Sequence, residues 1–183
     1  MSVVVAKVYD DRIEMAADSI CTRGWSMING DTTIPVKMVK HHDMILGGCG
    51  LAEETQLFFM YMKTHVIEEA DEQGVLNFVL EFKRWKKEYV DDDKLENSYI
   101  IALQGKCFGI SGKYVYEVEE YAAIGAGEDY ARGALYMGAT PEEAVKAACD
   151  LCVYVAEPII KESIPRNADK KKAKTAVAAE TKE

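Results

Sequence analysis

The chain has 183 residues, of which 49% are hydrophobic and 29% charged, and its formal net charge is -9 at pH 7. This length and composition predict one globular domain with its own core. The acidic balance argues against general nucleic-acid binding, which requires a basic surface. Apolar runs such as 57–62 are too short to cross a membrane, and the N-terminus lacks the pattern of a secretory signal, so we expect a cytoplasmic protein.

The cysteines and histidines do not form a recognisable metal or disulfide pattern. Five scattered cysteines are not a disulfide framework, and the single C-x-x-C formed by Cys149 and Cys152 has no second ligand pair. Both cysteines fall in a helical pattern, which favours packing in the core. The three histidines stand near no serine or cysteine constellation and are interpreted as surface or turn residues: His41, His42 and His65. We therefore expect neither a metal nor a cofactor.

The first half of the chain changes from strand patterns to helix patterns. β-Branched and apolar residues predict strands at 3–6 and 13–17, joined by a polar turn, and a second pair at 32–39 and 44–46. A glycine-rich junction, Gly47-Gly48-Cys49-Gly50, interrupts this pattern. Apolar residues at helical spacing then predict two helices, at 51–70 and 75–90.

The second half repeats this order. Strands are predicted at 98–103, 106–110, 114–118 and 121–124. The turn Gly125-Ala126-Gly127 begins a helix that is predicted to continue to Gly138. Thr140, Pro141 and Glu143 form a capping box that begins the next helix, which is predicted to end near residue 155. A last strand is predicted at 158–164.

Strands and helices come in blocks, which indicates an α+β protein built in layers rather than a doubly wound sheet. We predict a four-layer αββα sandwich, in which two sheets pack face to face and each outer face is covered by a pair of helices. The predicted domain is 1–164. Residues 165–183 are rich in Lys, Ala and Glu with almost no large apolar side chain, and are predicted to be a flexible charged tail.

Four features stand in a characteristic order in the first third of the chain. Ser2 directly precedes a β-branched strand, and Asp18 ends the returning strand sixteen residues later. Lys37 lies at the start of the next strand pair, and Gly47 opens the glycine-rich junction. In this order the sequence resembles the proteasome-type N-terminal nucleophile hydrolases, and among them the HslV-like peptidases. The resemblance covers about 2–164 and implies the αββα fold known as the N-terminal nucleophile hydrolase fold.

The resemblance also reaches the second half of the chain, with one departure there and one at the nucleophile. The Gly-x-Gly turn and Asp150, late in the fourth predicted helix, match the family pattern. Ala126, however, stands where the family commonly has a serine whose hydroxyl helps hold the N-terminal amine. The nucleophile itself is Ser2 rather than threonine, so the β-methyl group that restricts χ1 is missing.

The chemistry that the resemblance implies is physically coherent. If Met1 is removed, as is usual before serine, Ser2 carries both a hydroxyl nucleophile and an α-amine whose pKa is about 8. The Lys37 ammonium would keep that amine basic, and Asp18 would hold Lys37 by a charge-assisted hydrogen bond. A backbone N–H of Gly47 would receive the oxyanion. The implied reaction is peptide-bond hydrolysis through an acyl-enzyme.

The resemblance further implies a ring-shaped homo-oligomer that encloses its active sites and takes peptides or unfolded proteins as substrates. The chain has no G-x-x-x-x-G-K-[ST] motif and so is not expected to be its own P-loop ATPase. A separate ATP-dependent unfoldase as partner is implied by the resemblance alone. We also expect self-association because the run 57–62 is apolar on nearly all sides of its predicted helix. Two alternatives remain open: an inactive scaffold or assembly subunit, which Ala126 favours, and an amidase that acts on small substrates.

Overall fold

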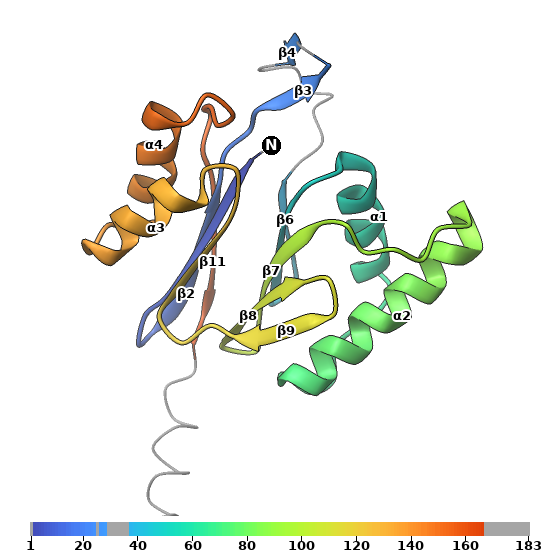
Figure 1. The fold of residues 1–183 in the computed structure, drawn as a ribbon. Coiled ribbons are helices and arrows are strands. Elements are labelled where there is room, and N and C mark those ends of the chain that lie inside the picture. The colour runs from blue at the N-terminus through green and yellow to red at the C-terminus, as the bar shows by residue number, and fades with distance from the viewer. Residues whose placement is uncertain (1, 25, 29–36, 167–183) are drawn as a thin grey trace, which may run out of the picture.

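The structure is a computed structural model that describes residues 2–24, 26–28 and 37–166. Figure 1 shows two sheets that face each other, with helices on both outer sides. The first half contains β1 (Val3–Val8), β2 (Arg12–Ala17), β3 (Cys21–Arg23), β4 (Ser26–Ile28), β5 (Met38–His41), β6 (Met44–Cys49), α1 (Ala52–Met62) and α2 (Glu72–Val90). The second half contains β7 (Ser98–Leu103), β8 (Lys106–Ser111), β9 (Tyr114–Glu117), β10 (Tyr121–Gly125), α3 (Glu128–Tyr136), α4 (Pro141–Leu151) and β11 (Ile160–Pro165).

The predicted α+β sandwich of four layers is confirmed. Among the described residues, one sheet has the strand order β10-β1-β2-β11 and the facing sheet the order β5-β6-β7-β8-β9. All of their strand pairs are antiparallel. In Figure 1, α3 and α4 cover the outer face of the first sheet, and α1 and α2 cover that of the second. A further short hairpin, β3–β4, was not predicted from the sequence.

The alternation of side chains along β1 explains how the layers are held together. Val3 and Val5 pack with α3 and α4, whereas Val4 and Ala6 point the other way, into the core between the two sheets. This period of two is the expected geometry of a strand. Because β1 is apolar on both faces, it fits only in the interior of the sandwich, and this placement fixes the position of Ser2 just before it.

The first helix is shorter than predicted. It ends at Met62, not near residue 70, where the last turn tightens: the backbone N–H groups of Lys63 and Thr64 donate to the carbonyls of Met60 (3.3 Å) and Tyr61 (3.1 Å), and the Thr64 hydroxyl also donates to Tyr61 (3.2 Å). Hydroxyl side chains compete in this way with helix continuation. The apolar run 57–62 is largely buried within the subunit, and of its residues only Met60 is more than half exposed, at 52%. The run therefore does not support the predicted self-association.

The capping box at the start of α4 is confirmed. Thr140 accepts a hydrogen bond from the backbone of Glu143 (3.3 Å), and the Glu143 carboxylate accepts one from the backbone of Thr140 (2.8 Å). The helix ends at Leu151, four residues before the predicted end. Beyond it the chain turns back to form β11, which pairs with β2.

The ends of two other predicted segments differ from the structure. Residues 32–36 of the strand predicted at 32–39 lie outside the described residues, and β5 begins at Met38. The last strand extends to Pro165, and Arg166 still donates its backbone N–H to the Asp11 carbonyl at 2.8 Å. The fold therefore continues at least two residues beyond the predicted boundary. The rest of the predicted tail, from residue 167, lies outside the described residues.

Candidate active site

Ser2 lies at the end of the sandwich where β1 begins, and only 4% of it is exposed. Its carbonyl accepts a hydrogen bond from the backbone N–H of Gly127 at 3.2 Å. At Gly125, with φ of +100°, an added Cβ would lie 2.4 Å from that carbonyl oxygen. Only glycine fits there. The predicted Gly-x-Gly turn thus lies directly against Ser2 and holds its backbone in place.

Asp18 is completely buried and connects several parts of the site. Its Oδ1 accepts a hydrogen bond from the backbone N–H of Val3 at 2.8 Å, and Oδ2 accepts one from Ile20 at 3.2 Å. The backbone N–H of Ala156, on the connection between α4 and β11, is 3.5 Å from the same oxygen. A carboxylate with this many donors remains in one orientation. Asp18 therefore fixes the first peptide of β1 directly after Ser2.

Lys37 forms the predicted ion pair with Asp18. Its Nζ lies 2.7 Å from Asp18 Oδ2, and the side chains are 10% and 0% exposed. Burial lowers the pKa of the Lys37 ammonium, although the Asp18 charge acts in the opposite direction. The backbone of Lys37 is held as well, because its carbonyl accepts from the N–H of Gly48 at 2.9 Å.

Cys49 interacts with both Ser2 and Lys37, and the sequence did not predict this role. Its buried thiol is hydrogen-bonded to the Ser2 side chain and donates to the Ile124 carbonyl at 3.5 Å. Burial raises the pKa of this thiol to about 12, while the charge of nearby Lys37 acts to lower it. The thiol is therefore neutral at ordinary pH and serves as a hydrogen-bonding neighbour of Ser2, not as a competing nucleophile.

The role of Gly47 as the oxyanion donor stays a prediction. Gly47 lies inside β6, where it pairs with Met38 on one side and Ile100 on the other. A Cβ there would meet Val4 at 2.6 Å in the core between the sheets. The glycine-rich junction continues beyond the strand to Gly50, with φ of +139°.

Ala126 lies in the turn that holds Ser2, as the resemblance predicts, and its carbonyl accepts a hydrogen bond from the Cys152 thiol at 3.5 Å. Cys152 is buried, whereas the following residue, Val153, is 84% exposed. A thiol thus supports the backbone of the turn from the end of α4. Neither cysteine contact could be predicted from spacing, because the partners belong to elements far apart in sequence.

Asp150 does not join this group of residues. Its carboxylate is exposed on α4 and pairs with Lys146, one turn earlier, at 3.1 Å. The structure thus brings Ser2, Asp18, Lys37 and the Ala126 turn together, and it places Asp150 on the outer surface. This contact does not connect Asp150 to Ser2, and its supporting role stays a prediction.

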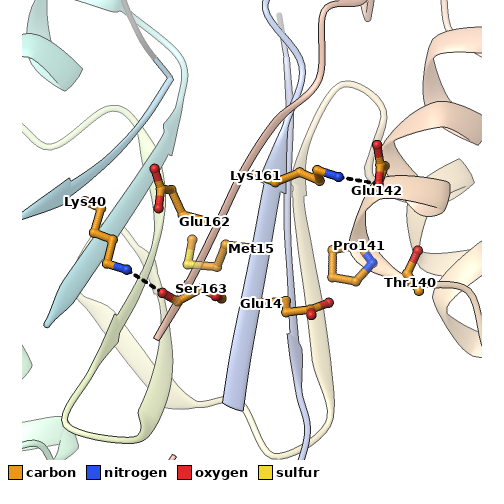
Figure 2. A pocket seen from close by; sticks show the side chains of 9 residues that line it. All are labelled: Glu14, Met15, Lys40, Thr140, Pro141, Glu142, Lys161, Glu162 and Ser163. Atoms are coloured by element: carbon orange, nitrogen blue, oxygen red, sulfur yellow. Dashed lines mark hydrogen bonds and ion pairs between the residues drawn. The ribbon is translucent and has the colours of Figure 1, made fainter. Parts of the chain in front are cut away.

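The cavity shown in Figure 2 lies elsewhere. It has a volume of about 440 Å³ and is lined by residues of β2, β5, α4 and β11, including Lys40 and Lys161. Its lysines are engaged: Lys40 donates to the Ser163 carbonyl and Lys161 pairs with Glu142. None of the predicted catalytic residues lines it. Within the described ranges, no cluster of three or more His, Cys, Asp or Glu side chains could hold a metal, and no helix could span a membrane.

The layers and strand order described above define the proteasome-type N-terminal nucleophile hydrolase fold, as the sequence predicted. Among solved structures, Thiobacillus denitrificans BPH matches with a TM-score of 0.79 and 20% identity, over 89% of this chain and 97% of that one. The same protein in complex with epoxomicin gives 0.77 and 18%, over 89% and 98%. Eukaryotic HslV from Trypanosoma brucei gives 0.70 and 18%, over 90% and 99%. No protein-family model and no curated protein matches the sequence.

Proposed function

We propose that this protein is a self-compartmentalising peptidase that uses Ser2, after removal of Met1, as an N-terminal nucleophile. The observation that carries the proposal is the buried Asp18–Lys37 pair, with Nζ and Oδ2 2.7 Å apart. Asp18 also binds the peptide that follows Ser2. A buried lysine whose pKa is lowered is uncommon in a merely structural position, and its placement beside a serine favours catalysis.

The proposed reaction has two halves. The Ser2 hydroxyl attacks the substrate carbonyl carbon while its proton passes to the Ser2 α-amine, and the negative charge on the carbonyl oxygen is received by a backbone N–H of the glycine-rich junction that Gly47 opens. Collapse of this intermediate breaks the C–N bond, the leaving amine takes the proton, and an ester remains on Ser2. Water, activated by the same α-amine, then hydrolyses the ester and regenerates the enzyme.

Lys37 and Cys49 have distinct roles in this proposal. The Lys37 ammonium disfavours a second positive charge nearby and so keeps the α-amine in its basic form. Asp18 orients Lys37 and prevents it from moving toward solvent. The neutral Cys49 thiol is hydrogen-bonded to the Ser2 side chain and so contributes to the placement of the hydroxyl.

Assembly into rings is the second part of the proposal. Support comes from the folds that match this one and from apolar side chains exposed on the single subunit, among them Leu151, Val153 and Tyr154 at the end of α4 and just beyond it. An assembly would remove such side chains from water. Peptides or unfolded proteins are the proposed substrates, a separate ATP-dependent unfoldase is the proposed partner, and a cytoplasmic location remains a prediction. Light scattering that gives a monomer at micromolar concentration would rule out the ring.

The deciding experiment compares wild type with Ser2→Ala, and with Ser163→Ala as a matched control on the exposed side of β11. Intact mass first establishes that Met1 is absent. We expect hydrolysis of fluorogenic peptides by wild type and Ser163→Ala but none by Ser2→Ala. Because a protein of similar fold is known in complex with epoxomicin, the same compound serves as a probe. We expect a mass adduct on wild type and Ser163→Ala, and none on Ser2→Ala.

The alternative is an inactive scaffold of the same fold, which Ala126 and the absence of the threonine methyl group favour. Wild-type protein that lacks Met1, forms rings and yet shows neither turnover nor an epoxomicin adduct would favour the scaffold. Retention of Met1 in the assembled protein would exclude the enzyme, because the α-amine would then be an amide without a basic lone pair.

A further inference from the structure

Behind the candidate active site, on the far side of β6, lies a cluster of buried polar side chains with no role in the reaction described above. Glu54 and Thr55 belong to α1, Asn97 precedes β7, Tyr99 lies on β7 and Lys86 comes from α2. All five are buried. Buried polar groups are costly unless they are fully hydrogen-bonded, so a cluster of this size requires an explanation.

Glu54 is the fixed centre of the cluster. Its Oε1 accepts hydrogen bonds from the Tyr99 hydroxyl at 2.9 Å and from the backbone N–H of Asn97 at 3.0 Å. Its Oε2 accepts from Lys86 Nζ at 2.9 Å and from the backbone of Glu96 at 3.1 Å. Burial, with Glu54 beside it, raises the pKa of Tyr99 well above its usual range, so Tyr99 remains a donor. The carboxylate has no freedom to rotate and therefore holds Asn97 in one position.

Asn97 in turn clamps both backbone groups of Leu51. Its Oδ1 accepts from the Leu51 N–H at 2.6 Å, and its Nδ2 donates to the Leu51 carbonyl at 2.8 Å and to Thr55 Oγ1 at 2.9 Å. The amide group also packs on Gly50, where an added Cβ would lie 2.0 Å from Asn97 Oδ1. The turn between β6 and α1 is therefore fixed by one side chain from a distant part of the sequence.

We infer that Asn97, held by Glu54, is a positioning residue that fixes the Gly50–Leu51 turn and, through it, the glycine-rich junction whose backbone N–H receives the oxyanion. This inference rests on the proposed peptidase function. The turn follows directly after Cys49, which contacts Ser2, so a change in its backbone alters the geometry next to the nucleophile. Oxyanion stabilisation depends strongly on donor placement, and an error of about 1 Å can reduce a rate by about a hundredfold.

A purely structural role is the competing interpretation. The residue that precedes α1, Leu51, has no side-chain cap, and Asn97 supplies the polar groups that a cap would provide. Loss of such a cap lowers stability but has no reason to affect one step of a reaction selectively. The test therefore has to separate catalysis from folding.

The test compares Asn97→Asp with Asn77→Asp, which makes the same change at an exposed position on α2. Aspartate at 97 still accepts the Leu51 N–H but cannot donate to the Leu51 carbonyl or to Thr55. We expect the acylation rate constant at saturating peptide to fall about 10- to 100-fold, while the half-saturating concentration changes less than about threefold. Asn77→Asp should behave like wild type in both respects.

Hydrogen exchange provides a second measurement that does not need turnover. In Asn97→Asp, the peptide segment around Gly50 and Leu51 should exchange faster, whereas the segments of β1 and β2 keep the wild-type protection. Faster exchange there with a selective loss of acylation supports the inference. If wild type is active and Asn97→Asp shows unchanged acylation or unchanged exchange at Gly50–Leu51, the inference about Asn97 is overturned while the proposed function stands. A wild type without turnover, although Met1 is absent, overturns the proposed function and this catalytic role together.

Discussion

Two lysine–carboxylate pairs are buried in the described part of this domain, and they differ in the number of carboxylates around the ammonium group. Lys86 contacts two, Glu54 at 2.9 Å and Asp92 at 2.8 Å, and also the carbonyl of Lys94 at 2.8 Å. Among the described residues, Lys37 has one carboxylate partner, Asp18 at 2.7 Å, which also accepts from backbone N–H groups.

The pKa shifts follow this difference. Burial acts to lower the pKa of both lysines, but at Lys86 the hydrogen bonds to Asp92 and Glu54 outweigh burial and raise it. At Lys37 burial prevails and the pKa is lowered. A buried ammonium group whose pKa is lowered is typical of functional positions, whereas one whose pKa is raised by several partners is typical of structural ones. The comparison therefore supports the proposed catalytic role of Lys37 and a structural role for Lys86.

The largest expected effect comes from removing each lysine in turn. Lys37→Met and Lys86→Met both leave a buried carboxylate with backbone or hydroxyl donors only, so each should lower the free energy of unfolding by about 3 kcal/mol. Peptide turnover should separate them: Lys37→Met should lose about a thousandfold, because the α-amine is then protonated and its placement is lost, whereas Lys86→Met should keep at least about a tenth.

Denaturant titration and peptide hydrolysis, both corrected for the folded fraction, make this comparison. Lys37→Arg is the additional variant: it keeps the charge but should not restore turnover, because a planar guanidinium does not replace a compact ammonium in this space. Equal losses of turnover in Lys37→Met and Lys86→Met would show that the pairs do not differ as described.

Replacing the carboxylate of each pair by an amide should show the same contrast in turnover, to a smaller degree. Asp18→Asn keeps the acceptor for Val3 but removes the charge that holds Lys37, so we expect turnover to fall about 100-fold. Glu54→Gln acts only through Asn97, and we expect a fall of about tenfold. Single-turnover acylation measures both. A greater loss in Glu54→Gln than in Asp18→Asn, at equal folded fraction, would reverse the assignment of the two pairs.

The dependence of rate on pH should report Lys37 and not Lys86. Acylation should rise as the α-amine loses its proton, then fall as Lys37 does so, at a pH below the usual lysine value of about 10.4. A lysine whose pKa is lower in the folded state binds fewer protons there than when unfolded, so its contribution to stability rises with pH across this window. The alkaline fall in rate is therefore not unfolding.

This profile is checked by kcat/KM between neutral pH and the ordinary lysine range, with Lys86→Met as the control. The alkaline fall should persist in Lys86→Met, since the pKa of Lys86 is raised and that group does not titrate in the window. A rate that stays constant up to the ordinary lysine range would contradict the role given to Lys37.

The sequence predicted features that depend on neighbouring residues, and it missed those that depend on contacts between elements far apart in the chain. The strand at 3–6, the capping box at Thr140 and the layer arrangement follow from local periodicity and were correct. Ser2, Asp18 and Lys37 were found by order and spacing within one short segment. Cys49 and Asn97 could not be found, because their partners lie in other elements and a buried cysteine or asparagine has no pattern of its own.

Two further site residues stay predictions, because their surroundings differ from what the family pattern suggested. Gly47 was taken from the resemblance as the start of a glycine-rich junction, and in the structure it lies inside a strand, where a glycine makes room for Val4 and Met15. Asp150 matched a position in a family pattern, and the helix end directs it to solvent beside Lys146. In both cases the residue type was informative, but the direction of the side chain or backbone was set by packing that sequence does not show.

The smallest expected effect concerns the turn at Ala126, where the proposed catalytic group lacks a side-chain hydrogen bond. Cys152 already holds the Ala126 carbonyl at 3.5 Å, so the backbone of the turn is in place and only a side-chain hydroxyl is missing. Ala126→Ser would supply one neutral hydrogen bond toward the α-amine, worth about 1 kcal/mol, or roughly fivefold in rate if it is made in the transition state. Ser2→Thr should add a smaller gain by restricting χ1.

Hydrolysis of a pool of fluorogenic peptides by wild type, both single variants and the double variant measures these gains. Ala139→Ser, at a half-buried position between α3 and α4, serves as the matched control and should leave the rate unchanged. A measurable wild-type rate that Ala126→Ser does not raise would show that the Lys37 side of the site, and not the turn at Ala126, limits catalysis. The lowered pKa of Lys37 would then be the property that determines the rate.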